Sequence, residues 1–144
     1  MTVAAILEHK GHDVVRAGLT DTIAEVVQRL TARHVGAVLV LDAAEQLLGI
    51  LSEREIVGGL VEHGSRTLEM TAAQLMTRIL HTATPATTVE QAMEMMTESR
   101  FRYLPVMDGG RLLGIVSIGD IVKARLSQQE HEVDSLKAYV VGTA

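Results

Sequence analysis

A serine followed three residues later by an acidic residue occurs twice in this sequence, each time directly after a short apolar run. Ser52 precedes Glu55, and Ser117 precedes Asp120. The apolar run predicts a β-strand and the pattern after it a helix, so each serine lies at a strand-to-helix junction. The first N–H groups of a helix lack partners within the helix, and the helix dipole adds a positive field there. Both junctions are therefore candidate anion sites, phosphate above all.

The same residues have a purely structural interpretation. Ser-x-x-Glu is a capping box and Ser-x-x-Asp is close to one, and either pattern starts a helix without binding any ligand. Glu55 is the better capping residue of the two acids. Arg54, however, adds a planar cation at the first junction, which favours phosphate. The residues by themselves leave both interpretations open.

The two junctions belong to an internal repeat. Residues 47–57 read LLGILSEREIV and residues 112–122 read LLGIVSIGDIV, which are identical at seven of eleven positions. These stretches are 65 positions apart, whereas Thr22 and Thr88, which each begin a capping-box pattern, are 66 apart. One residue is lost in the turn at residues 108–112, and indels belong in loops. The repeat is therefore structural, and it predicts a first repeat at 1–66, a second at 67–128 and a helical tail at 129–144.

Hydrophobic periodicity predicts the same element order in both repeats. In the first, helix, strand, strand and helix are expected at residues 22–33, 36–41, 48–51 and 52–62. Short strands are expected at Val14-Val15 and Ile79-Leu80, ahead of each repeat's first long helix. Pro105 cannot donate to a ladder, so its strand should lie at an edge or leave that side open. The expected fold class is α/β (α+β), with a small sheet and two flanking helices per repeat.

Composition narrows the function. The chain has 144 residues, 47% hydrophobic and 2% aromatic, with a net charge of −5 and no block of Lys or Arg. Nucleic acid is therefore not expected as a partner. Because there is no Cys, no signal-like N-terminus and no apolar run of membrane length, we expect a cytoplasmic protein with no membrane contact. The six His show no metal spacing, and no nucleophile set occurs, so neither a metal nor an enzyme is predicted.

Three stretches carry a resemblance to a known family. Residues 99–106, reading SRFRYLPV, and residues 114–121 resemble the second-domain signatures of the cystathionine-β-synthase (CBS) domain pair, or Bateman module. Residues 49–57 are similar to the version in small stand-alone bacterial CBS-pair proteins. The resemblance implies two clefts between the repeats that bind AMP, ADP, ATP, S-adenosylmethionine or NAD/NADH. It also implies a homodimer that senses such a ligand and regulates an unidentified partner.

The resemblance also implies particular contacts. In the second cleft, Ser117 would bind phosphate and the two oxygens of Asp120 would bind the ribose hydroxyls. The other expected contacts there are Ile118, Gly119, Ile79, Leu80, His81, Arg100, Arg102, Tyr103, Leu104 and Pro105. Those of the first cleft are Ser52, Arg54, Glu55, Lys10, Gly11, His12, Val14 and Val15. Glu55 stands where the family has Asp, so two alternatives stay open for the first cleft: it binds a nucleotide, for instance the phosphate end of a longer ligand, or it binds none.

Two other functions compete with a nucleotide sensor. One is a protein-interaction module with empty clefts, which would act through a dimer face and the tail from Ser127 onward, where Val133, Leu136, Val140 and Val141 are amphipathically spaced. The other is a small enzyme, such as a nucleotide hydrolase, for which the sequence offers no nucleophile and no general base with an evident partner.

Overall fold

The structure is a computed structural model that describes residues 1–79 and 81–143, and it separates into two compact units. One unit combines residues 1–12 with residues 81–144, and the other comprises residues 13–80. The units therefore divide the chain differently from the sequence repeats, because the first twelve residues pack with the second repeat. Each unit is described by itself.

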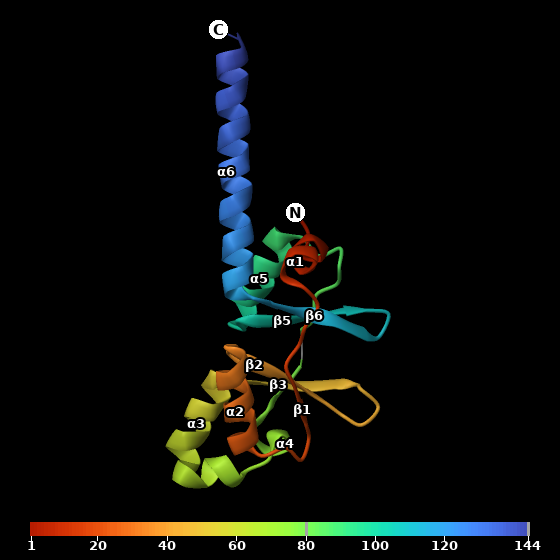
Figure 1. The fold of residues 1–144 in the computed structure, drawn as a ribbon, viewed down its shortest axis with the longest axis vertical. Helices are drawn as coiled ribbons and strands as arrows, with labels where there is room; N and C mark the ends of the chain where they lie inside the picture. Colours follow the sequence, from red (N-terminus) through yellow and green to blue (C-terminus); the bar gives the residue numbers. More distant parts are fainter. Residues whose placement is uncertain (80, 144) are drawn as a thin grey trace. The chain divides into compact units, whose positions relative to one another are not determined.

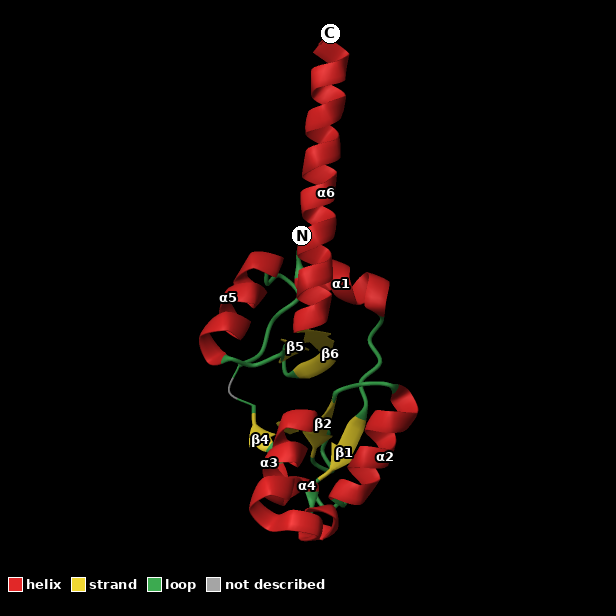
Figure 2. Cartoon of the chain, turned by 90° about the vertical axis from the view of Figure 1, so that its left-hand side faces the viewer, coloured by secondary structure: helices red, strands yellow, loops and turns green. Residues whose placement is uncertain are grey.

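The unit of residues 13–80 is built around a four-stranded sheet of order β1-β2-β3-β4. The pair β1-β2 is parallel and the other two pairs are antiparallel. Helices α2 and α3 lie on the same side of the sheet (Figure 2). Its elements are β1 (Arg16–Gly18), α2 (Ile23–Arg33), β2 (Ala37–Leu41), β3 (Leu47–Ser52), α3 (Glu53–His63), the 3₁₀ helix η1 (Gly64–Glu69), α4 (Ala72–Leu75) and β4 (Thr77–Arg78).

The other unit packs three helices on one side of the antiparallel pair β5-β6 (Figure 1). Its elements are α1 (Val3–Lys10), α5 (Val89–Ser99), β5 (Tyr103–Asp108), β6 (Arg111–Ser117) and α6 (Ile118–Thr143). The core is aliphatic and includes Leu7, Met96, Leu104 and Ile121, each at most 2% exposed. Pro105 faces the edge that carries only a single bridge from Ala83, as its missing N–H requires.

The predicted duplication is confirmed element by element, with α2-β2-β3-α3 matching α5-β5-β6-α6. Thr22 caps α2 by accepting a hydrogen bond from the Glu25 amide at 3.2 Å. Thr88 and Gln91 form a complete capping box at α5. Strand β2 is buried along its whole length, as its continuous apolar run predicts.

Two short strands differ from the prediction. The strand expected at Val14-Val15 begins at Arg16, although the Val15 carbonyl already accepts a hydrogen bond from the Leu39 amide. The strand expected at Ile79-Leu80 lies at Thr77–Arg78; Ile79 donates one further bond to Leu48, and Leu80 lies outside the described residues. In both cases the pairing with the neighbouring strand, rather than the apolar run, sets the bounds.

The first segments of the two repeats are exchanged between the units. Helix α1 packs against β6 of the second repeat, and β4 pairs with β3 of the first. The repeated glycine of each junction strand permits this close packing. A Cβ on Gly49 would lie 2.5 Å from the Met76 sulfur, and one on Gly114 would lie 2.9 Å from a Leu7 methyl. The exchange thus explains why both strands carry glycine in their interior.

The predicted tail is the continuation of α6 rather than a separate helix. Helix α6 runs for 26 residues, and residues 129–140 are all exposed (Figure 1). Throughout the described part of the chain, no helix combines the length and the apolar character needed to cross a membrane.

Candidate functional site

The second junction joins the last residue of β6, Ser117, to the first turn of α6. The Ser117 amide donates to Asp120 Oδ2 at 2.8 Å, and the Asp120 amide donates to Ser117 Oγ at 3.1 Å. These reciprocal bonds make the capping box that the sequence allows. Capping, however, uses only one of the two carboxylate oxygens.

Lys10, the last residue of α1, completes this cluster. Its ammonium donates to Asp120 Oδ2 at 2.7 Å and to the Ile115 carbonyl at 2.9 Å. The Lys10 and Asp120 side chains remain 34% and 24% exposed. Within the described residues no hydrogen bond reaches Asp120 Oδ1. An ammonium has three N–H donors, so the cluster offers one free carboxylate oxygen beside a cation with one donor to spare.

Charge and burial act in opposite directions on Asp120. Partial burial of the carboxyl raises its pKa, but the hydrogen bond from the Lys10 ammonium, the Ser117 amide, the lysine charge and the Ser117 hydroxyl together lower it by more. The net pKa of Asp120 lies below the ordinary value of 3.8. The carboxylate is therefore ionised at neutral pH, as binding hydroxyl donors requires.

The helix starts offer fewer unpaired N–H groups than the sequence predicts. The Ile118 amide donates to the Arg102 carbonyl at 2.7 Å, and its counterpart, the Glu53 amide, donates to the Gly36 carbonyl at 3.1 Å. A second amide of each helix is bonded to the capping serine. Two of the amides that lack partners within each helix are therefore bonded outside it, one to the residue that precedes the first strand of the hairpin and one to the capping serine. A phosphate near Ser117 would depend on cationic side chains.

The first junction uses its carboxylate differently. The Ser52 hydroxyl donates to Glu55 Oε2, while Ser52 Oγ accepts from the Arg54 amide at 3.3 Å. No ion pair of Glu55 occurs among the described residues. We expected Lys10, Gly11 and His12 here, but α1 carries them to the second junction. The residue 66 positions after Lys10 is Met76, whose thioether packs against Gly49.

Several other predicted residues lie in the same unit as the second junction. His12 Nδ1 donates to the Leu113 carbonyl at 2.7 Å, next to the Lys10 contacts. Tyr103 pairs in register with Ser117 across the hairpin, and the His81 ring lies 5.9 Å from the Phe101 ring. Leu104 is fully buried in the core of this unit, so its side chain is not open to a ligand.

The predicted residues divide between the two units. Thirteen lie in the unit that holds Asp120: Lys10, Gly11, His12, His81, Arg100, Arg102, Tyr103, Leu104, Pro105, Ser117, Ile118, Gly119 and Asp120. Six described residues lie in the unit that holds Glu55: Val14, Val15, Ser52, Arg54, Glu55 and Ile79. Ile79 belongs to a different unit from Asp120 and hydrogen-bonds to Leu48, so its contact with a ligand at Asp120 stays a prediction.

Sequence reasoning missed three participants at the second junction. The carbonyls of Leu113 and Ile115 hold His12 and Lys10, and Phe101 contacts His81. Backbone carbonyls carry no sequence signal. Phe101 had one, because it stands between the two arginines predicted to bind phosphate.

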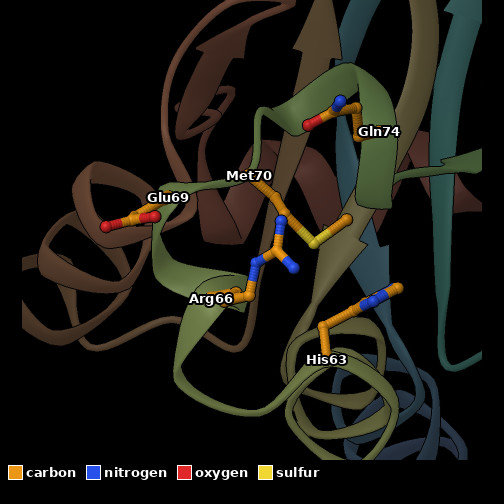
Figure 3. A pocket seen from close by; sticks show the side chains of 5 residues that line it. All are labelled: His63, Arg66, Glu69, Met70 and Gln74. Carbon is orange, nitrogen blue, oxygen red and sulfur yellow. The ribbon is translucent and has the colours of Figure 1, made fainter.

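Two surface hollows include neither Lys10 nor Asp120 among their lining residues. One, of about 390 Å³, is lined by His63, Arg66, Glu69, Met70 and Gln74, with the Glu69 carboxylate turned away from the Arg66 guanidinium (Figure 3). It contains no predicted site residue. The other, of about 580 Å³, runs along the start of α6 and includes Ile118 and Gly119. Among the described residues, no group of His, Cys, Asp and Glu is placed to hold a metal ion.

Two copies of a helix–strand–strand–helix unit, each with a serine-capped junction, define a tandem-repeat α/β module. The chain belongs to the CBS domain family, whose pattern matches residues 6–62 and 72–127. It is 33% identical over 149 aligned residues to the mitochondrial CBS domain-containing protein CBSX3 of Arabidopsis thaliana, covering 98% of this chain and 72% of that protein.

Solved structures share this fold. A CBS-domain containing protein of Agrobacterium tumefaciens is 42% identical with a TM-score of 0.84, covering 86% of this chain and 92% of that one. A CBS domain protein of Pyrobaculum aerophilum, solved in complex with AMP, is 24% identical with a TM-score of 0.74, covering 83% and 89%. The latter likeness supports the fold alone.

Proposed function

We propose that this CBS pair is a regulatory module that binds an adenosine nucleotide, either AMP, ADP, ATP or an NAD(H)-type dinucleotide, at the second junction. One observation carries the proposal: the half-buried Asp120 carboxylate lies directly beside the Lys10 ammonium, and within the described residues one of its two oxygens accepts no hydrogen bond. A ribose supplies the hydroxyl donors for that oxygen, and a phosphate supplies the acceptor for the remaining ammonium donor.

Surrounding residues suit the rest of such a ligand. Arg102, which directly precedes β5 and accepts a hydrogen bond from the Ile118 amide, has an exposed side chain and provides a further cation for a phosphate chain. The His81 and Phe101 rings form the aromatic contact in this unit, next to the strand that carries Tyr103.

The first junction is proposed as the weaker site. Glu55 is engaged by the hydroxyl of its own capping serine, and no ion pair holds it in the described part of the chain. Among the described residues, no ammonium lies beside Glu55 as Lys10 lies beside Asp120, so a ribose bound there would lack the neighbouring ammonium for its phosphate. Any contact at this junction is therefore proposed to be with phosphate, through Arg54.

A protein-interaction module remains the second candidate. The observation that favours it is the row of exposed apolar side chains on α6, including Leu136 at 65% exposed. In either case we propose that the chain works as a homodimer and regulates a partner protein instead of catalysing a reaction.

Thermal unfolding against AMP, ADP, ATP, NAD, NADH and S-adenosylmethionine tests the proposal, with GMP as a base control. A ligand present at 100 times its dissociation constant stabilises the folded protein by about 2.7 kcal/mol, which is readily measured. We expect one or more adenosine compounds to raise the Tm and the rise to be lost in Asp120→Asn. A panel without any shift would contradict the sensor and leave the interaction module.

A further inference from the structure

Exposed apolar side chains continue along α6 far beyond the core of its unit. Ile121 and Ala124 are buried against that core, whereas Leu126, Val133 and Leu136 are 55%, 51% and 65% exposed. In Figure 1 the helix extends well past α1 and α5. Surface patches of this kind, continuous along one element, mark interaction sites.

The spacing of the row is that of a coiled coil. From Val122 onward its positions follow one another at intervals of four, three, four, three and four residues, which is a heptad repeat. The a positions are Leu126, Val133 and Val140, and the d positions are Val122, Gln129 and Leu136. Valine at a with leucine at d favours a coiled coil of two helices. A single polar residue in the seam, which is the row of a and d positions, fixes the register.

The seam is compatible with the packing of α6 in its own unit. Val122 follows the buried Ile121 by one residue, which rotates it by about 100° around the helix. Helix α6 therefore presents one face to its core and a separate face to a partner. The hollow of about 580 Å³ along the start of α6 includes Val122 and Leu126, so the seam opens onto unfilled surface.

Charged residues beside the seam indicate which partner the helix takes and whether the two helices run parallel or antiparallel. Glu132 lies at a g position and Lys137 at the following e position. In a parallel, in-register pair, g of one helix faces this e of the other, so each Glu132 meets the other copy's Lys137. No ion pair of either residue occurs within the described chain. Arg125, at the previous g position, is already bonded to Glu90 at 3.0 Å in its own unit.

We propose that residues 122–140 of α6 form a parallel two-stranded coiled coil with a second copy of this chain. The Gln129 side chains of the two copies face each other in the seam, and two Glu132–Lys137 pairs flank it. This arrangement specifies how the chains associate and does not depend on nucleotide binding.

Engineered cysteines test the direction and register, because the chain has no cysteine of its own. A disulfide requires two Cα atoms within about 7 Å, which a d position meets with its own copy in a parallel pair. Under mild oxidation we expect Gln129→Cys to cross-link about tenfold faster than Ser135→Cys, which lies on the outer face. Equal rates would overturn the proposal. So would preferential cross-linking of Gln129→Cys to Val140→Cys in a mixture, because that result requires antiparallel helices.

A charge exchange in the Gln129→Cys background tests the partner residues. Lys137→Glu sets two glutamates against each other across the seam, and we expect cross-linking to slow at low salt. Adding Glu132→Lys restores opposite charges and should restore the rate. If the double exchange stays as slow as the single one, the Glu132–Lys137 contact does not exist and the proposed register is wrong.

Discussion

The two strand-to-helix junctions share a serine cap and a carboxylate one turn later, yet they use that carboxylate in different ways. Asp120 Oδ2 accepts hydrogen bonds from the Ser117 amide and the Lys10 ammonium, and no hydrogen bond within the described residues reaches the other carboxylate oxygen. Glu55, one methylene longer, is bonded to the hydroxyl of Ser52. Duplication thus preserved the backbone, while the exchanged segment decided the chemistry, since α1 brings a lysine where the other copy has Met76.

The exchanged segments themselves are tested by the two repeated glycines, where we expect the largest effects. A methyl on Gly49 would meet the Met76 sulfur and the Thr77 backbone carbonyl at 2.9 Å, and a backbone group cannot retreat. A methyl on Gly114 meets only the flexible end of Leu7. Urea unfolding should show Gly49→Ala destabilising by about 2–3 kcal/mol and Gly114→Ala by about 1 kcal/mol. The reverse order would contradict the packing described here.

The capping serines should also differ. In Ser52→Ala the half-buried Glu55 loses its hydroxyl donor and the Arg54 amide loses its acceptor, so a loss of about 2 kcal/mol is expected. In Ser117→Ala, Asp120 keeps both the backbone amide and Lys10, so about 1 kcal/mol is expected. Denaturant midpoints of the two variants provide the comparison. Equal losses would mean that the two carboxylates are held alike.

Lys10→Met makes the second junction resemble the first. The partly exposed ion pair and its hydrogen bonds are worth about 1 kcal/mol of unfolding free energy. Burial raises the pKa of Asp120 and the Lys10 ammonium lowers it, so the pKa of Asp120 should rise once the ammonium is removed. An NMR titration of the carboxyl carbon measures this directly. Lys123→Met, an exposed lysine of the same unit, is the matched control, and an unchanged Asp120 pKa in Lys10→Met would refute the pairing.

Acid should lower the folding stability of both units, and the effect of each single carboxyl group should be the smallest of those predicted here. The hydrogen bond from Arg29 lowers the pKa of Asp21, and the pKa of Asp120 is lowered as well. A carboxyl whose pKa is lower when folded contributes stability above its unfolded value, and this contribution disappears as the pH falls through the folded value. Stability measured from pH 5 downward should therefore fall below about pH 4, less steeply in Asp21→Asn or Asp120→Asn. A slope identical to wild type in both variants would contradict these assignments.

Many of the helices and strands could be predicted from the sequence because the residues that specify them lie close to them in the chain. The capping threonines, the buried run of β2 and the glycine–serine junctions all lie within about a dozen residues of the elements that they specify. The α6 helix was recognisable in the same way, although it is continuous with the tail. The 3₁₀ helix η1, at residues 64–69, lacks a periodic pattern and was not predicted.

The candidate site was only half predictable. The spacing of Ser117 and Asp120 predicts their contact. Lys10, however, lies 110 positions from Asp120, and only the fold brings these two residues together. The repeat offset placed Lys10 at the first junction, because an offset compares positions along the sequence and cannot show that two segments are exchanged. The interior glycines, Gly49 and Gly114, were the available clue, since glycine within a strand often marks the close approach of another segment.

Calorimetric titration of Asp120→Asn and Glu55→Gln with the adenosine compound that stabilises the wild type most tests the central claim. Each substitution removes one charge at the same position of its repeat and preserves the shape of the side chain. Because a hydrogen bond to a charged group contributes about 1.5–3 kcal/mol, Asp120→Asn should weaken binding by about 10- to 100-fold. Glu55→Gln should bind as the wild type does. Wild-type affinity in Asp120→Asn, or a greater loss in Glu55→Gln, would contradict the assignment of the ligand to the Lys10–Asp120 junction.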